Sequence, residues 1–467
     1  MSPVAERHDT YVAEYGRFTK GRGAAAPAWV KEHRERAQNQ FAKAGFPTTR
    51  QEDWRFTNIT PIAESEFALA SGAFAQASAL VAGVTVPGSV RLVIVNGEFA
   101  AGLSDLSALP KGLRIASLRD GARDATDGIE THLGKVFNTH THPFAALNTA
   151  FLDDGVAIVV TAGAVVETPI HIVIVTGGDL PSEASAKGGG QAVVAHPRVL
   201  IVAGANSQVR VAQTFIGAAG DIYFNNAVAE VVVGEGANVE LYTDQRESDQ
   251  AFHILNIQAH VGAKGVFASH AFSTGSRIMR HDIGIGLKGE GADCTMNGVY
   301  LADGERLMDT HTSLDHAMPH CTSHEIYKGI LAGKAKAVFN GRIIVRLDAQ
   351  KTDAKQTNRA LLLSDDATMN SNPQLEIFAD DVKCTHGAAV GQLDEEAMFY
   401  LQARGLNRVE ARDMLLHAFA GEVIEGLKIP ALRAQIETTF FARLRQGSGA
   451  QAPPGVTLRP GTGQAGR

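Results

Sequence analysis

One short turn recurs along the middle of this 467-residue chain. It appears in the segments AGAN, VGEGAN, VGAKG, KGEGAD and AGKAKA, with its glycine at positions 204, 234, 262, 289 and 333. Successive glycines are 30, 28, 27 and 44 residues apart. A period of this size is typical of supersecondary units that stack on one another. An ordinary β-sandwich would have less reason to keep it.

Short β-branched runs alternate with these turns: RLVIV, AIVV, HIVIV, RVLIV, EVVV and NVELY, separated by Gly, Asn and Asp. A right-handed parallel β-helix explains both features, because each coil adds short strands to long sheets and needs Gly or Asn where the backbone turns sharply. Coils are stable only when stacking buries their apolar columns, and the stack leaves open strand edges. The sequence therefore predicts a mainly β protein with such a core, and a partner for the open edge.

Helical patterns flank the predicted core. Trp29, Val30, His33, Ala37 and Phe41 recur at helical intervals before Gly45 and Pro47 end the pattern. We expect a largely helical N-terminal region over residues 1–89 and the parallel β-helix over residues 90–392, with almost no helix before residue 393. The glycine-rich segment 183–191 is expected to be a flexible loop.

The C-terminal pattern predicts a helical domain over residues 393–446. Asp394 is the expected N-cap of a first helix that ends at Gly405, and Asn407 with Glu410 forms a capping box for a second helix. A third helix follows Pro430. Residues 447–467 are rich in Gly, Pro and Ser, and we expect this tail to be disordered.

Composition excludes several functional classes. Acidic residues exceed basic ones, 50 against 43, and no long block of Lys or Arg marks a nucleic-acid or membrane surface. Cys294, Cys321 and Cys384 are too few and too far apart for a disulfide framework, which favours a reducing compartment. No signal peptide or apolar span is evident, so we expect a cytoplasmic protein with neither nucleic acid nor membrane as a partner. The P-loop motif GxxxxGKS is absent from the sequence, so we expect no ATP on this chain.

Cys384 and His386 form one candidate site. Side chains two apart on a strand point the same way, so a strand through VKCTHGAAVG places both on one face. A thiolate beside an imidazole is a soft donor pair suited to a metal or to sulfur chemistry. From spacing alone, a small buried cysteine and a hydrogen-bonded turn histidine remain an open alternative.

Two further histidine groups invite metal hypotheses that their spacing does not favour. The segment HTSLDHAMPHCTSHE crowds together His311, His316, His320, Cys321 and His324, but no second cysteine dyad completes a zinc pattern. His140 and His142 could share one face of a strand, yet the downstream Glu and His of a cupin-like site are not evident. We expect neither group to bind a metal.

The segments KTDAKQTNRALLLSDDA (351–367), NPQLEIFADDVKCTHGAAVGQLDEEAMFYLQARGL (372–406), DHAMPHCTSHEIYKGIL (from Asp315) and EDWRFTNI (from Glu52) resemble the SufB/SufD family of iron–sulfur cluster assembly proteins. The resemblance is stronger to its SufD branch, since the SufB branch is expected to carry an acidic HEA-type motif and more cysteines. It implies the same β-helix fold and a scaffold subunit, not a stand-alone enzyme.

The resemblance also implies partners and sites. The β-helix would pair with SufB through its C-terminal coils, and the C-terminal helical domain would bind the ATPase SufC. His386, with Cys384, would hold iron or a transient iron–sulfur cluster shared with SufB, so His386 is the expected metal ligand. Met414, Phe419 and Val423 are the expected contacts of the C-terminal helices with SufC. Whether the chain binds a flavin is left open.

Two other functions stay open on the sequence. Parallel β-helices also occur in secreted carbohydrate-active enzymes, which need paired carboxylates. Asp380 and Asp381 are adjacent and would face opposite ways on a strand, so they cannot flank one glycosidic bond. The second alternative is a homodimeric iron-binding protein that acts without SufB.

Overall fold

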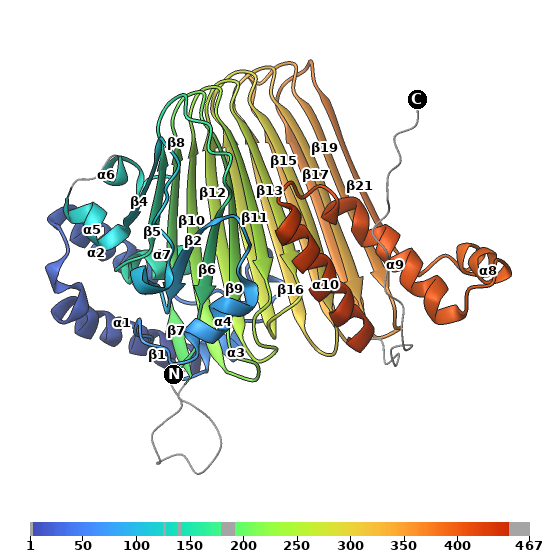
Figure 1. Cartoon of the computed structure of the whole chain (residues 1–467), viewed down its shortest axis with the longest axis horizontal. Helices are drawn as coiled ribbons and strands as arrows, with labels where there is room; N and C mark the ends of the chain where they lie inside the picture. Colours follow the sequence, from blue (N-terminus) through green and yellow to red (C-terminus); the bar gives the residue numbers. More distant parts are fainter. Residues whose placement is uncertain (1–2, 125–127, 138–141, 179–191, 448–467) are drawn as a thin grey trace, which may run out of the picture.

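The computed structural model describes residues 3–124, 128–137, 142–178 and 192–447. Two long sheets, sheet A and sheet B, run along the molecule, and the chain alternates between them (Figure 1). The predicted loop at 183–191 and residues 448–467 of the tail predicted over 447–467 lie outside the described residues, whereas Gly447 ends the last helix.

Sheet A has eleven strands and sheet B has ten. In spatial order, sheet A consists of β20 (Thr368–Ile377), β18 (Lys336–Val345), β16 (Leu307–His316), β14 (Ile278–Leu287), β12 (Phe252–Val261), β10 (Tyr223–Val233), β8 (Arg198–Ala203), β5 (Val156–Val160) and β4 (Leu113–Ser117), with β7 (Val193–Ala195) and β1 (Ala68–Leu69) beside β10. Sheet B consists of β21 (Lys383–Gly391), β19 (Asp353–Leu362), β17 (Thr322–Leu331), β15 (Asp293–Ala302), β13 (Val266–Ser273), β11 (Asn238–Gln245), β9 (Gln208–Ile216), β6 (Ile170–Val175), β2 (Val90–Val95) and β3 (Glu98–Phe99).

Neighbouring strands within each sheet come from successive coils and pair in parallel. Between β10 and β20 one row of residues paired from strand to strand reads Ala229, Ile257, Ile283, Thr312, Gly341 and Pro373. Every pairing in this row is parallel. Only at the N-terminal end do antiparallel pairs occur, β2 with β3 and β4 with β5, among the described strands. The predicted parallel β-helix is thus confirmed as a parallel β-solenoid flanked by helices.

The turn glycines form rows along the solenoid. Gly204, Gly234, Gly262 and Gly289 lie at corresponding turns, where a side chain would collide with the backbone of the preceding coil; a Cβ on Gly289 would lie 2.0 Å from the amide nitrogen of Ala263. Gly333 follows β17 of sheet B and lies against Gly304 of the opposite row. The irregular interval of 44 residues therefore reflects a change of row, not a longer coil.

The main core lies between the two sheets. Alternate side chains of each strand point inward and stack in columns, as Ala259, Ile285, Leu314 and Ile343 do in sheet A. Parallel strands lie about 4.8 Å apart, so these side chains contact one another directly and keep water out of the interior. The sequence alternation of β-branched residues is the local cause of this packing.

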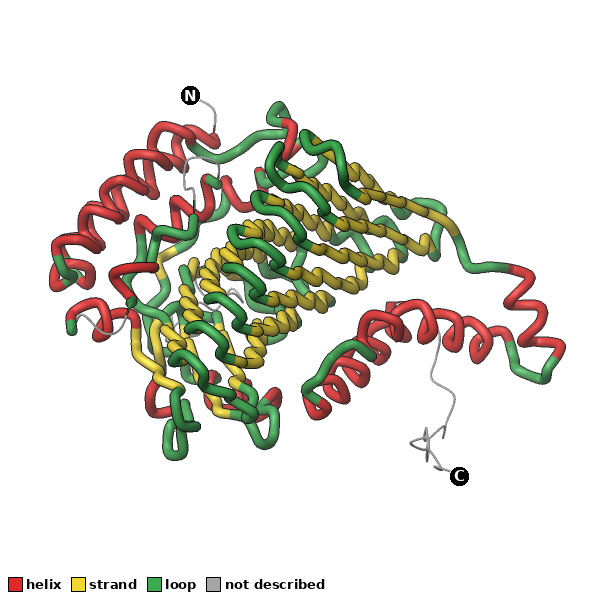
Figure 2. The backbone as a smooth tube through the Cα atoms, turned by 90° about the horizontal axis from the view of Figure 1, so that it is seen from above, coloured by secondary structure: helices red, strands yellow, loops and turns green. Residues whose placement is uncertain are grey.

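The helices cover the outer faces of the sheets, with the N-terminal and C-terminal groups on opposite sides of the solenoid (Figure 2). Helices α1 (Pro3–Lys20), α2 (Ala28–Ala44), α3 (Thr60–Ala63) and α7 (Pro143–Ala150) lie with sheet A, and α4 (Ala77–Val84) packs on β6. The helix predicted to end at Gly45 is confirmed. The expectation of almost no helix between residues 90 and 393 was wrong: α5 (Leu118–Arg123), α6 (Ile129–His132) and α7 interrupt the early strands. Pro143 starts α7, and the helix packs against α2.

Three helices follow β21: α8 (Glu395–Ala403), α9 (Arg408–Ile424) and α10 (Pro430–Gly447). Asp394 caps α8 and the capping box of Asn407 and Glu410 starts α9, as predicted. Helices α9 and α10 turn back over the outer face of sheet B, where their apolar side chains join those of β11, β13, β15 and β17 in one cluster. The C-terminal helices are therefore anchored on the solenoid.

A buried arginine fixes the N-terminal region to sheet A. Arg280 forms ion pairs of 2.7 Å with both Asp282 and Asp309, and its guanidinium lies 3.7 Å from the ring centroid of Trp54. Thr57 donates a hydrogen bond of 2.6 Å to Asp309. This network joins the EDWRFT segment to two successive coils.

We expect Arg280→Met to lower the free energy of unfolding by about 3–5 kcal/mol, because the buried carboxylates of Asp282 and Asp309 would lose their counter-charge. Urea unfolding followed by tryptophan fluorescence measures the change. Arg342→Met is the matched control: Arg342 is half-exposed and 3.9 Å from Glu376, so its loss should cost less than about 1 kcal/mol. Equal effects of the two substitutions would contradict the assigned role of Arg280.

Candidate functional site

Cys384 and His386 lie on β21, the terminal strand of sheet B. They pair in register with Ala354 and Gln356 of β19, whose side chains are buried inside the solenoid. Both residues therefore share one face of the strand, as its alternation predicted, and the pairing with β19 shows that this is the inward face of the last coil. Within the described residues β21 has no strand on its other side, so this face lies at the open end of the solenoid (Figure 1).

The two side chains differ in exposure. Cys384 is partly buried against the interior core, and burial raises the pKa of its thiol above the ordinary value of 9.0. The thiol is therefore protonated at neutral pH in the isolated chain, and binding a metal through sulfur would release that proton. His386 is exposed and available for a ligand or a partner.

Apolar side chains surround this end of the solenoid. Ile377 ends β20, Phe378 follows it, Val390 lies on β21 and Leu347 lies in the turn after β18, with exposed fractions of 41%, 60%, 46% and 66%. β20 is likewise the terminal strand of sheet A. The end thus combines two unpaired strand edges with exposed apolar surface, which is the combination expected of a protein interface.

A polar column leads inward from His386. Gln356 on β19 pairs with His386, and Glu325 on β17 pairs with Gln356. The Nε2 of Gln356 donates a hydrogen bond of 2.7 Å to Glu325. Burial raises the pKa of Glu325 to about 7. Sequence reasoning missed this column, because its members are about 30 residues apart and only the register of the coils brings them together.

The three expected partner-binding residues on α9 lie in different environments. Met414 is 49% exposed and lines a shallow groove between α9 and α10. Phe419 is partly buried beneath Lys328 of β17, whose ammonium lies 4.7 Å from the ring centroid. Val423 is 2% exposed in the cluster against sheet B, so it belongs to the core and not to an outer surface. Of the three, Met414 is the side chain that the helix presents to solvent.

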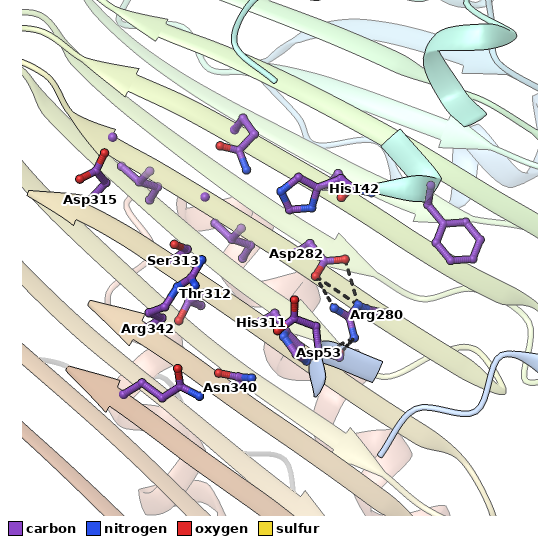
Figure 3. Close-up of a pocket in the computed structure, with 18 of the residues that line it drawn as sticks. Asp53, His142, Arg280, Asp282, His311, Thr312, Ser313, Asp315, Asn340 and Arg342 are labelled. Carbon is purple, nitrogen blue, oxygen red and sulfur yellow. Dashed lines mark hydrogen bonds and ion pairs between the residues drawn. The ribbon is translucent and has the colours of Figure 1, made fainter. Parts of the chain in front are cut away.

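A separate groove of about 260 Å³ lies on the outer face of sheet A (Figure 3). Gly284 and Gly286 lie in its floor, where the side chains of Gln258 and Lys288 occupy the space above them, and His142 at the start of α7 lies at its wall. Three positive side chains line it, Arg280, Lys288 and Arg342, and three negative ones, Asp53, Asp282 and Asp315. The lining residues therefore carry no net formal charge.

The predicted histidine groups do not converge. His311 lies on the outer face of β16 beside Asp309, whereas the ring of His316 points inward and lies 2.9 Å from the hydroxyl of Ser323. Cys321 is buried, His320 lies in a turn and His324 is exposed. His140 lies outside the described residues. In the part of the chain that the structure describes, no three His, Cys, Asp or Glu side chains are placed to hold a metal ion.

The expectation that Asp380 and Asp381 lie on a strand was wrong. Both lie in the connection before β21, where Asp381 forms an ion pair with Lys351. None of the helices in the described ranges is long and apolar enough to cross a membrane.

Comparison with known proteins places this geometry in context. The profile described as the SufBD core domain of SUF-system FeS cluster assembly matches residues 185–419, and that of the SufBD N-terminal region matches residues 5–172. The chain is 30% identical to an iron–sulfur cluster assembly SufBD family protein of Synechocystis, over 88% of this chain and 90% of the relative. It is 29% identical to the iron–sulfur cluster assembly protein SufD of Escherichia coli, over 88% and 92%, and 26% identical to SufD of Bacillus subtilis, over 90% and 95%.

The raised pKa of Glu325 predicts a pH-dependent stability. The unfolded carboxyl ionises near its ordinary value of 4.5, whereas the folded one holds its proton to about pH 7. Its stabilising contribution is therefore complete below about pH 4.5 and is lost as the pH rises through 7. Relative to wild type, Glu325→Gln should gain about 2 kcal/mol in free energy of unfolding between pH 5 and pH 8. Urea titrations at these two pH values measure the gain, and a difference that does not change with pH would contradict the shift.

Proposed function

Because the chain belongs to the SufBD family of SUF-system iron–sulfur cluster assembly proteins, we propose that it is the SufD-type, non-ATPase scaffold subunit of a SufB–SufC–SufD complex. In this proposal the open end of its solenoid pairs with SufB, and iron or a nascent cluster is held where the two chains meet. The observation that carries the proposal is the position of Cys384 and His386 on the inward face of the terminal strand β21.

The donor set supports a shared site. Iron in a cluster is held by thiolates, with imidazole an accepted substitute, and a cluster generally takes four protein ligands. Cys384 and His386 supply two, and no group of three possible metal ligands occurs among the described residues. The remaining ligands would come from the partner, so the cluster is a cargo of the complex and not a resident cofactor of this chain.

The surroundings of the site support pairing with another solenoid. A strand of SufB added beside β20 or β21 would satisfy the free backbone groups and cover Phe378 and Val390. Interface formation would also exclude water from His386 and Cys384. Excluding water protects a nascent cluster and strengthens its bonds to charged ligands.

The energy for assembly would come from SufC. The chain has no P-loop motif, and we propose that ATP hydrolysis on SufC reaches the solenoid through α9. Lys328 of β17 is the link: its Nζ donates a 2.9 Å hydrogen bond to the carbonyl oxygen of Phe419 and pairs with Glu422. β17 also carries Glu325, so a shift of α9 acts on the strand next but one to β21.

We expect His386→Ala to remove most of the cluster absorbance formed when the SufB–SufC–SufD complex is reconstituted anaerobically with iron and sulfide, because a shared site would lose one ligand. The complex itself should keep its stoichiometry, since the exposed imidazole contributes little packing. The visible spectrum and size-exclusion chromatography with light scattering measure the two properties.

His324→Ala is the matched control, since His324 is exposed on the outer face of β17 and should leave the spectrum unchanged. Failure of the His386→Ala chain to assemble would identify His386 as an interface packing residue. A chain that forms only homodimers and ignores SufB would overturn the scaffold proposal in favour of an iron-binding homodimer.

We expect Met414→Asp to weaken binding of SufC at least tenfold, about 1.4 kcal/mol, because a charge would be placed in an apolar contact on α9. The stability of the chain should change by less than about 0.5 kcal/mol, since Met414 is half-exposed. Isothermal titration calorimetry with purified SufC measures the affinity. Ile222→Asp, at a similarly exposed residue in the turn before β10, should bind SufC normally; weakening by both substitutions alike would contradict docking on α9.

A further inference from the structure

We propose that Gln356, held by Glu325, is a positioning residue that fixes the ring orientation and tautomer of His386. The inference rests on the proposed function of His386 and adds two buried residues of the solenoid interior to the site. Of these three residues, only His386 would bind the metal. Gln356 and Glu325 would act indirectly, by holding the imidazole ring of His386 in place.

The register of the coils brings the three residues together. Glu325, Gln356 and His386 occupy corresponding inward positions on β17, β19 and β21. Adjacent parallel strands are about 4.8 Å apart, so successive inward side chains are neighbours in the column. Glu325 and Gln356 are hydrogen-bonded to each other, whereas no hydrogen bond joins Gln356 Oε1 to His386 in this structure. Glu325 and Gln356 are 1% and 2% exposed, whereas His386 is exposed at the open end. The column thus runs from the sealed interior to the candidate site.

The amide of Gln356 is anchored on one side only. Its Nε2 donates to Oε2 of Glu325 at 2.7 Å, which turns Oε1 away from β17. That Oε1 is buried and has no hydrogen-bond partner within the described part of the chain. A buried carbonyl oxygen without a partner is costly, so it is a ready acceptor for a donor that comes close to it. The neighbour on the side away from β17 is β21, with His386 at the paired position.

A glycine makes room for this amide. Gly341 lies on β18 opposite Gln356, and a Cβ added to it would come within 2.3 Å of the Gln356 Nε2. Any other residue at 341 would push the amide out of its place. The position of Gln356 is therefore set by Glu325 on one side and by the absence of a side chain on the other.

The chemistry of histidine ligation gives this arrangement a purpose. A neutral imidazole binds a metal through the lone pair of one nitrogen and carries its proton on the other. An oxygen that accepts the N–H fixes which nitrogen is free, and loss of such a partner typically weakens metal binding 10–100-fold. Oxygen Oε1 of Gln356 can accept a hydrogen bond from this N–H, whereas the amide nitrogen Nε2, which is a donor, cannot.

The test compares four variants of the full chain. Gln356→Met removes the oxygen at similar volume, Glu325→Met frees the amide to flip, and Glu325→Gln keeps an acceptor for Nε2. Asn358→Leu is the control: it removes the next inward amide of β19, which donates to the Tyr327 carbonyl and pairs in register with Ala388, not with His386. Long-range ¹H–¹⁵N correlation spectra of the metal-free chain at pH 8, assigned by loss of the His386 signals in His386→Asn, report the tautomer.

We expect one His386 tautomer to predominate in wild type, Glu325→Gln and Asn358→Leu, and a mixture in Gln356→Met and Glu325→Met. In the reconstituted complex, Gln356→Met should retain iron 10–100-fold more weakly. An unchanged tautomer ratio in Gln356→Met, or a shift in Asn358→Leu as large as in Gln356→Met, would overturn the inference. These outcomes are distinct from failure of the proposed function, which would appear as normal cluster formation by His386→Ala.

Discussion

The structure depends on one constraint: the backbone N–H and C=O groups of each solenoid strand find hydrogen-bond partners only on the strands of the coils before and after it. Parallel pairing between coils leaves the backbone N–H and C=O groups on the outer edge of the final coil without partners, however well the interior is packed. The N-terminal end solves the problem within the chain, where antiparallel β3 and β4 and the helices α1, α2 and α7 surround the first coils. The C-terminal end leaves β20 and β21 as edges, and the chain departs from it into α8.

The exposure of the candidate site follows from its position at that open end. Inward positions elsewhere in the solenoid are filled by apolar columns or by buried polar side chains, such as His316, whose ring lies beside Ser323. On β21 the same inward face is exposed, so Cys384 and His386 combine the fixed geometry of a core position with the access of a surface one. Rigid placement of ligands on strands is better suited to a precise site than placement on loops.

Much of the fold could be predicted because its signals are local. The β-branched runs, the turn glycines, the N-cap Asp394 and the capping box at Asn407 each depend on residues close in sequence, and the structure confirms them. Helix α7 was not predicted, because β-branched runs typical of strands surround it in the sequence. The assignment of Val423 to an outer surface failed for a different reason: an apolar stripe does not say which of its residues face sheet B.

The candidate site was predictable only in part. The alternation of β21 placed Cys384 and His386 on one face, as expected, but the inward direction of that face follows from pairing with β19. Glu325 and Gln356 could not be found from spacing, because a register that differs by one residue would turn either of them outward. The groove around His142 and Arg280 likewise joins three distant segments.

The stacking of coils also determines how such a chain can change in length. Insertion of a complete coil of about 30 residues would add one strand to each sheet and move the open end by about 4.8 Å, with every inward column continued. Insertion of a single residue at the start of β21, before Cys384, would invert the strand and carry Cys384 and His386 to the outside. Relatives of different length can therefore keep the same end surface, provided that they grow by whole coils.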